Sequence, residues 1–483
     1  METGNAILFV VLTTVSLCFG WGIRGLIIGG ERGAMLPGAF LGLLLAWFSG
    51  SPVIQENFWI FAAIGAVGMS FGGLETYGQT IGFVMHLGEP DHDPKRGYTG
   101  LAFKGFVWQG VSAAFMGICF SAMAGNTYKW YDFVIFFLQL PLAHALGYRM
   151  FNMPYDQKKG IMPPVAFSID RQEEWGRNLF LIFELFFLML LRQDTFSMWM
   201  MLFGMVFGAV GWLVGITFYR LGEHPRKNGR YRLPRLHNKW KIFDGWKAME
   251  FTQGAFIGLG MSLCVLFRWE EFSAIISVIQ QNGKLHSFLP ENIEPALAWG
   301  TAGLLLLSTY LGLLMHLKKP AFLYRFFKER RFLLECVQRP FYMAFPPLLM
   351  FLGSPTMGKI GSFLLVYFVL AQNNALERFN YHKRVNLIRL AFLASMIAAV
   401  IGQILLDGYS LWQTFLMYSV IYIALDFVHH ASAKMRAARK ERRKGEPGIG
   451  AWIRSFGGTA TVHSAFVVML VIMLVLGAAA FRV

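Results

Sequence analysis

The stretch from Phe196 to Tyr219 reads FSMWMMLFGMVFGAVGWLVGITFY, 24 residues without a single Lys, Arg, Asp or Glu. A helix needs about 20 consecutive apolar residues to cross the hydrocarbon core of a bilayer, so this stretch by itself predicts a transmembrane helix. The whole chain has the same character, because 55% of its 483 residues are hydrophobic and only 15% are charged. Soluble domains carry about 25% charged residues. The sequence therefore predicts an all-α integral membrane protein.

Thirteen further apolar runs raise the prediction to about fourteen transmembrane helices in a polytopic bundle. The fourteen runs cover residues 6–29, 33–49, 57–86, 101–123, 130–150, 178–191, 196–219, 247–267, 296–317, 339–353, 357–376, 386–406, 411–429 and 460–481. Two of them, 178–191 and 339–353, are short, and whether they span the whole bilayer is left open.

Lysine and arginine are distributed unevenly over the loops between these runs. Of the 44 basic residues, 36 fall in odd-numbered loops and six on the other side, while Arg24 and Lys104 lie inside runs. Cytoplasmic loops carry an excess of Lys and Arg, so the odd-numbered loops are predicted to be cytoplasmic. Both termini are then predicted to lie outside, in a multi-pass protein of the cell (inner or plasma) membrane. This topology, with anionic lipid headgroups as partners, explains the net charge of +16. Nucleic acid is not predicted as a partner.

The runs and loops give three predicted regions. Residues 1–267 form an N-terminal bundle of eight helices, 268–295 an external loop, and 296–483 a C-terminal bundle of six helices. Within the external loop, 272–281 has the pattern of a short amphipathic helix. The C-terminal bundle contains a basic cytoplasmic segment, 434–454, that fits a membrane surface.

Helical hairpins are predicted to repeat in the first half. The segment Gln109-Gly-Val-Ser-Ala-Ala-Phe-Met-Gly resembles Gln253-Gly-Ala-Phe-Ile-Gly-Leu-Gly, and Gly65-Ala-Val-Gly resembles Gly208-Ala-Val-Gly. The two pairs are separated by 144 and 143 residues, as expected for one duplicated helix pair. The alternative is chance, since Gly and Ala recur wherever membrane helices pack closely.

Polar residues inside the apolar runs are the best indicators of function, because ionisable groups at bilayer depth are energetically expensive and face the bundle interior. Most of them fall in the cytoplasmic halves of their helices, which predicts a polar cavity open to the cytoplasm. The alternative is that they are helix-end residues reaching for the nearer interface. The candidate solute-binding residues are Arg24, Glu75, Gln79, Lys104, Gln109, Glu250, Gln253, Asn373 and Asn374. The candidates for coupling or proton transfer are Glu75, Glu184 and Glu250.

Two glycine-rich stretches, 20–33 and 71–82, are predicted to face each other, because glycine permits unwinding and close backbone approach. Arg24 and Glu75 occupy matched places in them and are predicted to form an ion pair, either beside a solute path or as a structural bridge. The amides of Gln109 and Gln253 could bind sugar hydroxyls or a carboxylate, or could hydrogen-bond neighbouring helices.

No cofactor or metal site is predicted. The four cysteines are far apart with no CxxC, and the glycine-rich stretches contain no phosphate-binding motif. The repeat, the glycine-broken helices and the intramembrane charges favour a transporter or permease, including a flippase-like one, for a polar or anionic small solute. The alternative is a membrane-embedded transferase acting on a lipid-linked acceptor at the cytoplasmic leaflet, with a phosphorylated or CoA donor. Its general base would be Glu75, His144 or Glu250. The oligomeric state is left open.

Overall fold

The computed structural model describes residues 3–27, 32–72, 77–86, 92–168, 173–223 and 245–288. These residues form helices joined by short connections, with one isolated bridge and no strand among them. The helices are α1 (Thr3–Ile27), α2 (Met35–Phe48), α3 (Pro52–Glu56), α4 (Phe58–Gly72), α5 (Gly78–Met85), α6 (Pro94–Ala124), α7 (Trp130–Phe151), α8 (Trp175–Leu191), α9 (Thr195–Glu223), α11 (Gly245–Phe267) and α12 (Trp269–Asn282), with 3-10 turns η1 (Arg32–Ala34) and η2 (Gln157–Lys159). The predicted helical class is confirmed for this part of the chain.

Five of the described helices are long and apolar enough to cross a membrane. They lie within α1, α6, α7, α9 and α11, and α2 and α4 are shorter apolar helices. These lengths indicate a membrane protein. The predicted helix at 272–281 is also present, as α12. The six helices predicted beyond residue 288 lie outside the described residues.

The predicted apolar run at 57–86 contains two helices. The first, α4, ends at Gly72, and the second, α5, begins at Gly78. Gly72 and Gly73 follow each other at the end of α4, where glycine lowers the stability of a continuing helix. Tyr77, at the junction, is thereby placed between the two helices.

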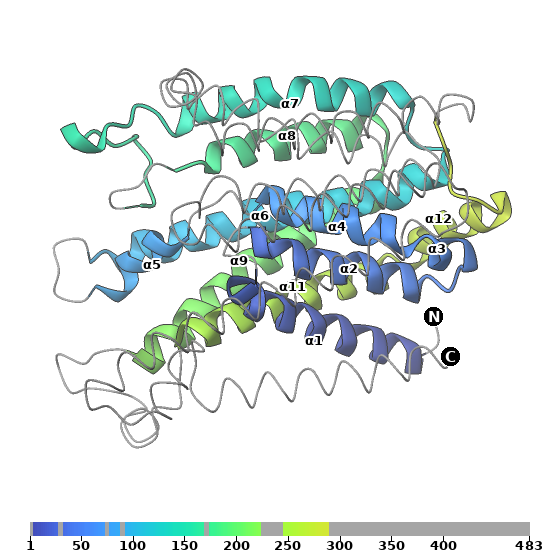
Figure 1. Cartoon of the computed structure of the whole chain (residues 1–483), viewed down its shortest axis with the longest axis horizontal. Coiled ribbons are helices and arrows are strands. Elements are labelled where there is room, and N and C mark those ends of the chain that lie inside the picture. Colours follow the sequence, from blue (N-terminus) through green and yellow to red (C-terminus); the bar gives the residue numbers. More distant parts are fainter. Residues whose placement is uncertain are drawn as a thin grey trace, which may run out of the picture.

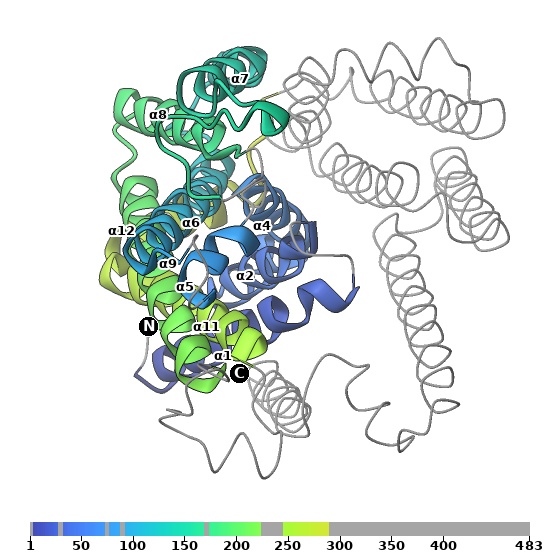
Figure 2. The same ribbon diagram turned by 90° about the vertical axis from the view of Figure 1, so that its left-hand side faces the viewer.

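Six helices form a ring in which each contacts the next. The order is α1, α2, α4, α6, α9 and α11, and α11 closes the ring by contacting α1. Figure 1 shows these helices lying side by side, and Figure 2 views them nearly end-on. The α7–α8 pair forms a separate layer against α6 and α9, and α5 packs on α6. The ring thus consists of the hairpins α1–α2, α4–α6 and α9–α11.

Glycines lie at the three junctions between these hairpins. Gly38 of α2 meets Gly65 of α4, Gly105 of α6 meets Gly208 of α9, and Gly254 of α11 meets the backbone of α1. A Cβ atom on any of these glycines would lie closer than 3.0 Å to a backbone oxygen of the facing helix. Small residues allow this direct backbone contact in membrane proteins, so the ring depends on them.

Phenylalanine rings fill the end of the ring where α1 and α9 begin. Phe61 and Phe120 have ring centroids 4.5 Å apart, and Phe120 packs against Phe272 of α12 at 5.0 Å. Phe196, at the start of α9, stacks on Phe272 at 5.3 Å. The charged residues Arg24, Lys247 and Glu250 lie at the opposite end, where α1 ends and α11 begins.

Candidate functional site

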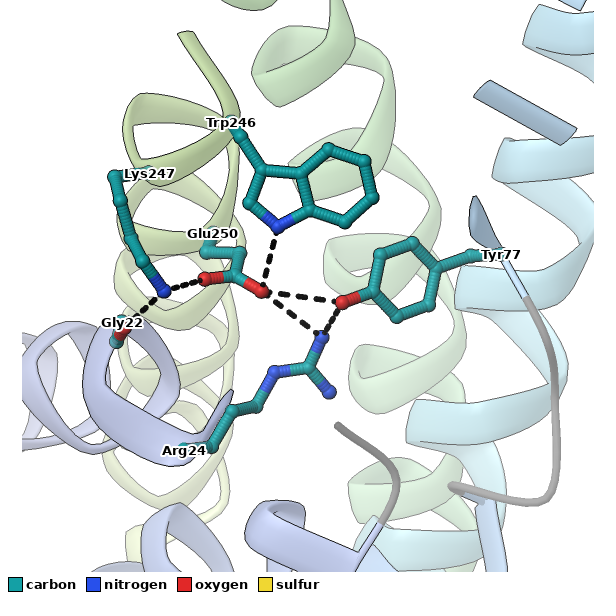
Figure 3. Close-up of polar contacts among 6 residues, drawn as sticks. All are labelled: Gly22, Arg24, Tyr77, Trp246, Lys247 and Glu250. Carbon is teal, nitrogen blue, oxygen red and sulfur yellow. Dashed lines mark hydrogen bonds and ion pairs between the residues drawn. The ribbon is translucent and has the colours of Figure 1, made fainter. Parts of the chain in front are cut away.

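A buried polar cluster lies where α1 ends, α5 begins and α11 begins. Arg24 is in the last turn of α1, Tyr77 immediately precedes α5, and Trp246, Lys247 and Glu250 are in the first two turns of α11. Figure 3 shows their polar groups converging on the carboxylate of Glu250. The break between α4 and α5 is what allows Tyr77 to reach a site shared by two other helices.

Glu250 is the common acceptor of this cluster. Its Oε1 accepts hydrogen bonds from the hydroxyl of Tyr77 at 3.1 Å and from the indole N–H of Trp246 at 3.1 Å. The same oxygen lies 3.6 Å from a guanidinium nitrogen of Arg24, which also donates to the Tyr77 hydroxyl. The other oxygen, Oε2, accepts from Lys247, whose Nζ donates to the carbonyl of Gly22 at 2.9 Å.

Aromatic rings surround the guanidinium of Arg24. Its Cζ lies 4.3 Å from the ring centroid of Trp21, 5.0 Å from that of Tyr77 and 5.5 Å from that of Trp108. Trp212 continues this shell, with its ring 4.5 Å from that of Tyr77. A desolvated cation over an aromatic face gains about 2 kcal/mol, so these rings partly replace the water that Arg24 loses.

The cluster is deeply buried. Arg24 is 0% exposed and Glu250 2%, while Lys247 is also buried. Among the described residues of the cluster there are two cationic side chains and one carboxylate. Burying an unpaired ion costs several kcal/mol even after relaxation, so the contacts of Glu250 with Arg24 and Lys247 stabilise all three charged groups.

The structure brings together two of the residues singled out by sequence, Arg24 and Glu250. One residue from each glycine-rich stretch takes part, because Arg24 donates a hydrogen bond to Tyr77. The predicted ion pair of Arg24 with Glu75 is not described, because Glu75 lies outside the described residues. Asn373 and Asn374 also lie outside them.

Lys104 belongs to a different site. Its Nζ lies 2.8 Å from Oε1 of Glu173 and donates to the Thr80 hydroxyl at 2.9 Å, and both charged side chains are 0% exposed. Glu173 also accepts from the backbone of Phe167 at 2.6 Å and from the Ser168 hydroxyl at 3.0 Å. Lys104 therefore does not extend to an interface. The Lys104–Glu173 ion pair connects the segment before α8 to α6, and the hydrogen bond to Thr80 connects it to α5.

The remaining predicted residues are dispersed. Gln79 is half-buried near the start of α5, and Glu184 lies in the middle of α8, in the layer outside the ring. His144 is buried in α7 against Phe71. The structure does not bring Glu184 to the Arg24 cluster.

Gln109 and Gln253 approach α9 from its two neighbours in the ring, α6 and α11. The Nε2 of Gln253 donates to the carbonyl of Gly208 at 3.3 Å, and a Cβ atom on Gly208 would collide with the side chain of Gln109. Both glutamines are 0% exposed. The two glutamines that match in sequence thus both contact α9 at Gly208.

Sequence reasoning missed Tyr77, Lys247 and the tryptophans of the cluster. Lys247 stands three residues before Glu250, a spacing that places both on one helix face. Tyr77 lies inside the second glycine-rich stretch. The spacing of Lys247 and the position of Tyr77 were both visible in the sequence. However, Lys247 was assigned to the end of a basic loop, and Tyr77 is one of many aromatic residues.

The chain matches no known family model, and no curated protein or solved structure is significantly similar to it. Its function is therefore inferred from the chemistry of the described residues.

Proposed function

We propose that the protein is a multi-pass membrane permease for a small anionic solute, and that Arg24 binds the anionic group. The observation that carries this proposal is the buried cluster of Arg24, Lys247 and Glu250 at the break between α4 and α5. Interrupted helices in membrane transporters supply polar groups to solute sites. Arginine is suited to carboxylates, because its guanidinium donates two parallel hydrogen bonds.

In this mechanism the solute replaces Glu250 at Arg24. Glu250 holds Arg24 through one oxygen, at 3.6 Å, and holds Lys247 through the other. The carboxylate can therefore leave Arg24 and keep its contact with Lys247. An incoming carboxylate then pairs with Arg24.

The proposal includes the full predicted topology of about fourteen helices, with both termini outside, in the cell membrane. It also includes the hairpin repeat in the first half. Its support is that Gly65 and Gly208, which match in sequence, each contact the second helix of the preceding hairpin. Hairpins joined through glycine backbones can rock against one another, and such rocking alternates access in transporters built from repeats.

The test is a thermal-unfolding screen of the detergent-purified protein against acetate, propionate, D-glycerate, D-gluconate, malate and phosphate. We expect at least one anion to raise the unfolding temperature of the wild type and not that of Arg24→Gln. A matched control is Arg149→Gln, since Arg149 is exposed on α7. A wild type that responds to none of these anions, or an Arg24→Gln variant that responds equally, contradicts the proposal.

A membrane-embedded transferase is the second candidate, and the phenylalanine packing at the other end of the ring favours it. Phe61, Phe120 and Phe272 close together at that end, and an enzyme needs access from one side only. Proteoliposomes distinguish the two functions. A permease moves the stabilising anion across the bilayer, whereas a transferase binds it without translocation.

A further inference from the structure

Several buried polar atoms near the Arg24 cluster have no hydrogen-bond partner in the described structure. They are Nε2 and Oε1 of Gln109, Oε1 of Gln253, and the indole nitrogens of Trp21 and Trp212. Trp108 shows the usual arrangement, because its indole N–H donates to the carbonyl of Met69 at 2.8 Å. Most buried polar groups in native proteins are hydrogen-bonded, so several unpaired ones in one region call for an explanation.

These atoms lie in one layer of the ring. Gln109 and Gln253 meet at Gly208, and Oε1 of Gln253 lies against Gly211, the residue before Trp212. Trp21 packs on Gly254, the residue after Gln253. Four ring helices, α1, α6, α9 and α11, thus each contribute to the layer.

The layer adjoins the Arg24 cluster directly. The ring of Trp21 lies 4.3 Å from Cζ of Arg24 and 5.0 Å from the ring of Trp108, the residue before Gln109. The ring of Trp212 lies 4.5 Å from that of Tyr77, which bonds Glu250. A solute held at Arg24 therefore lies next to the rings of Trp21 and Trp212, whose indole nitrogens are unpaired in the described structure.

We infer that Gln109, Gln253, Trp21 and Trp212 form a second subsite, which binds hydroxyl groups of the solute. The substrate class is then small hydroxylated carboxylic acids, such as sugar acids. This inference rests on the proposed function, since the carboxylate is assigned to Arg24.

The chemistry of the unpaired atoms selects hydroxyl groups. The indole nitrogens only donate, the Gln253 oxygen only accepts, and the Gln109 amide does both. A hydroxyl group is at once a donor and an acceptor, so a few hydroxyls satisfy this mixed set. Sites that hydrogen-bond a hydroxyl discriminate strongly against the analogue that lacks it, because their buried groups stay unpaired.

The experiment compares the binding of D-glycerate and propionate, which share a three-carbon skeleton and differ in two hydroxyl groups, with D-gluconate as a longer hydroxy acid. Dissociation constants are measured by isothermal titration of the purified full-length protein. We expect the wild type to bind a hydroxy acid roughly tenfold or more tightly than propionate. We expect Gln109→Leu and Gln253→Leu to reduce this ratio toward one, by weakening the binding of the hydroxy acid more than that of propionate.

The control is Ser112→Ala, one turn from Gln109 on the same helix, where the hydroxyl is already bonded to the carbonyl of Trp108. It should keep the wild-type ratio. Gln109→Leu removes an unpaired buried amide, so its unliganded thermal stability should equal or exceed that of the wild type. This readout separates a solute-binding amide from a structural one, whose loss lowers stability.

Two failures are distinguishable. If the wild type binds propionate as tightly as the hydroxy acids, or Gln109→Leu and Gln253→Leu both keep the wild-type ratio, the second subsite is wrong while the anion site stands. If the wild type binds no carboxylate, the proposed function itself fails.

Discussion

Replacing Glu250 by Gln should destabilise the protein and make it more responsive to added carboxylate. Glu250 is 2% exposed and contacts Arg24, Lys247, Tyr77 and Trp246. Removing one partner of a buried ion pair costs about 3–5 kcal/mol. The unfolding entropy is about 2.1 cal/mol/K per residue, so 1 kcal/mol shifts the unfolding temperature of a 483-residue chain by about 1 °C. We therefore expect a fall of roughly 3–5 °C.

The assay is thermal unfolding in detergent at a fixed scan rate, because unfolding of large proteins is often irreversible. Acetate should raise the unfolding temperature of Glu250→Gln more than that of the wild type, since the substitution removes the charge that competes with acetate for Arg24. The double variant Arg24→Gln/Glu250→Gln should lose less stability than the sum of the two single variants. Residues in contact couple by 0.5–3 kcal/mol in such cycles.

Glu56→Gln is the control, because Glu56 is exposed at the end of α3 and should be replaceable without effect. The reasoning is refuted if Glu250→Gln is as stable as the wild type, or if the effects of Arg24→Gln and Glu250→Gln add fully. A destabilised Glu250→Gln that acetate does not stabilise further would leave the cluster a structural bridge only.

Three other predictions concern parts of the molecule away from this cluster. Lys104→Met alone should lower the free energy of unfolding by about 3–5 kcal/mol, measured through the unfolding temperature. The double variant Lys104→Met/Glu173→Leu should recover most of this loss, because no buried charge is then left unpaired. A double variant that is as unstable as Lys104→Met would contradict this. Gly208→Val should prevent folding, seen as aggregation in size-exclusion chromatography, because its Cβ would strike a carbonyl oxygen of α6, whereas Gly4→Ala, with open space around it, should elute normally. Burial and two nearby lysines lower the pKa of His286 in the folded state. The neutral imidazole therefore stabilises the folded state above the ordinary histidine pKa of 6.5, and this contribution is lost as the pH falls. Between pH 7.5 and 5.5, the unfolding temperature of His286→Gln should fall less than that of the wild type.

The sequence was a good guide to the helices, and the glycine-rich stretch 71–82 marked the place where α4 ends and α5 begins. Apolar runs such as 101–123 and 196–219 correspond to α6 and α9 because burial in lipid requires long unbroken stretches. The run 57–86 satisfied the same hydropathy criterion although it contains α4 and α5. Hydropathy averages over a window and does not detect two adjacent glycines that end a helix.

The site was predicted in part. Arg24 and Glu250 stood out because a charge in an apolar run needs a partner. Their pairing could not be predicted, since they are 226 residues apart in sequence and meet only because α11 closes the ring against α1. Lys104 stood out for the same reason, yet its partner Glu173 lies in a connecting segment, where a carboxylate gives no signal.

The most direct test of the central claim is uptake of radiolabelled propionate, D-glycerate, D-gluconate and malate into proteoliposomes containing the purified full-length protein. We expect at least one of these anions to enter wild-type proteoliposomes faster than protein-free liposomes, and Arg24→Gln to abolish the difference. Entry at the protein-free rate for all four, or entry through Arg24→Gln at the wild-type rate, would contradict the assignment of the buried Arg24 cluster as the solute site of a permease.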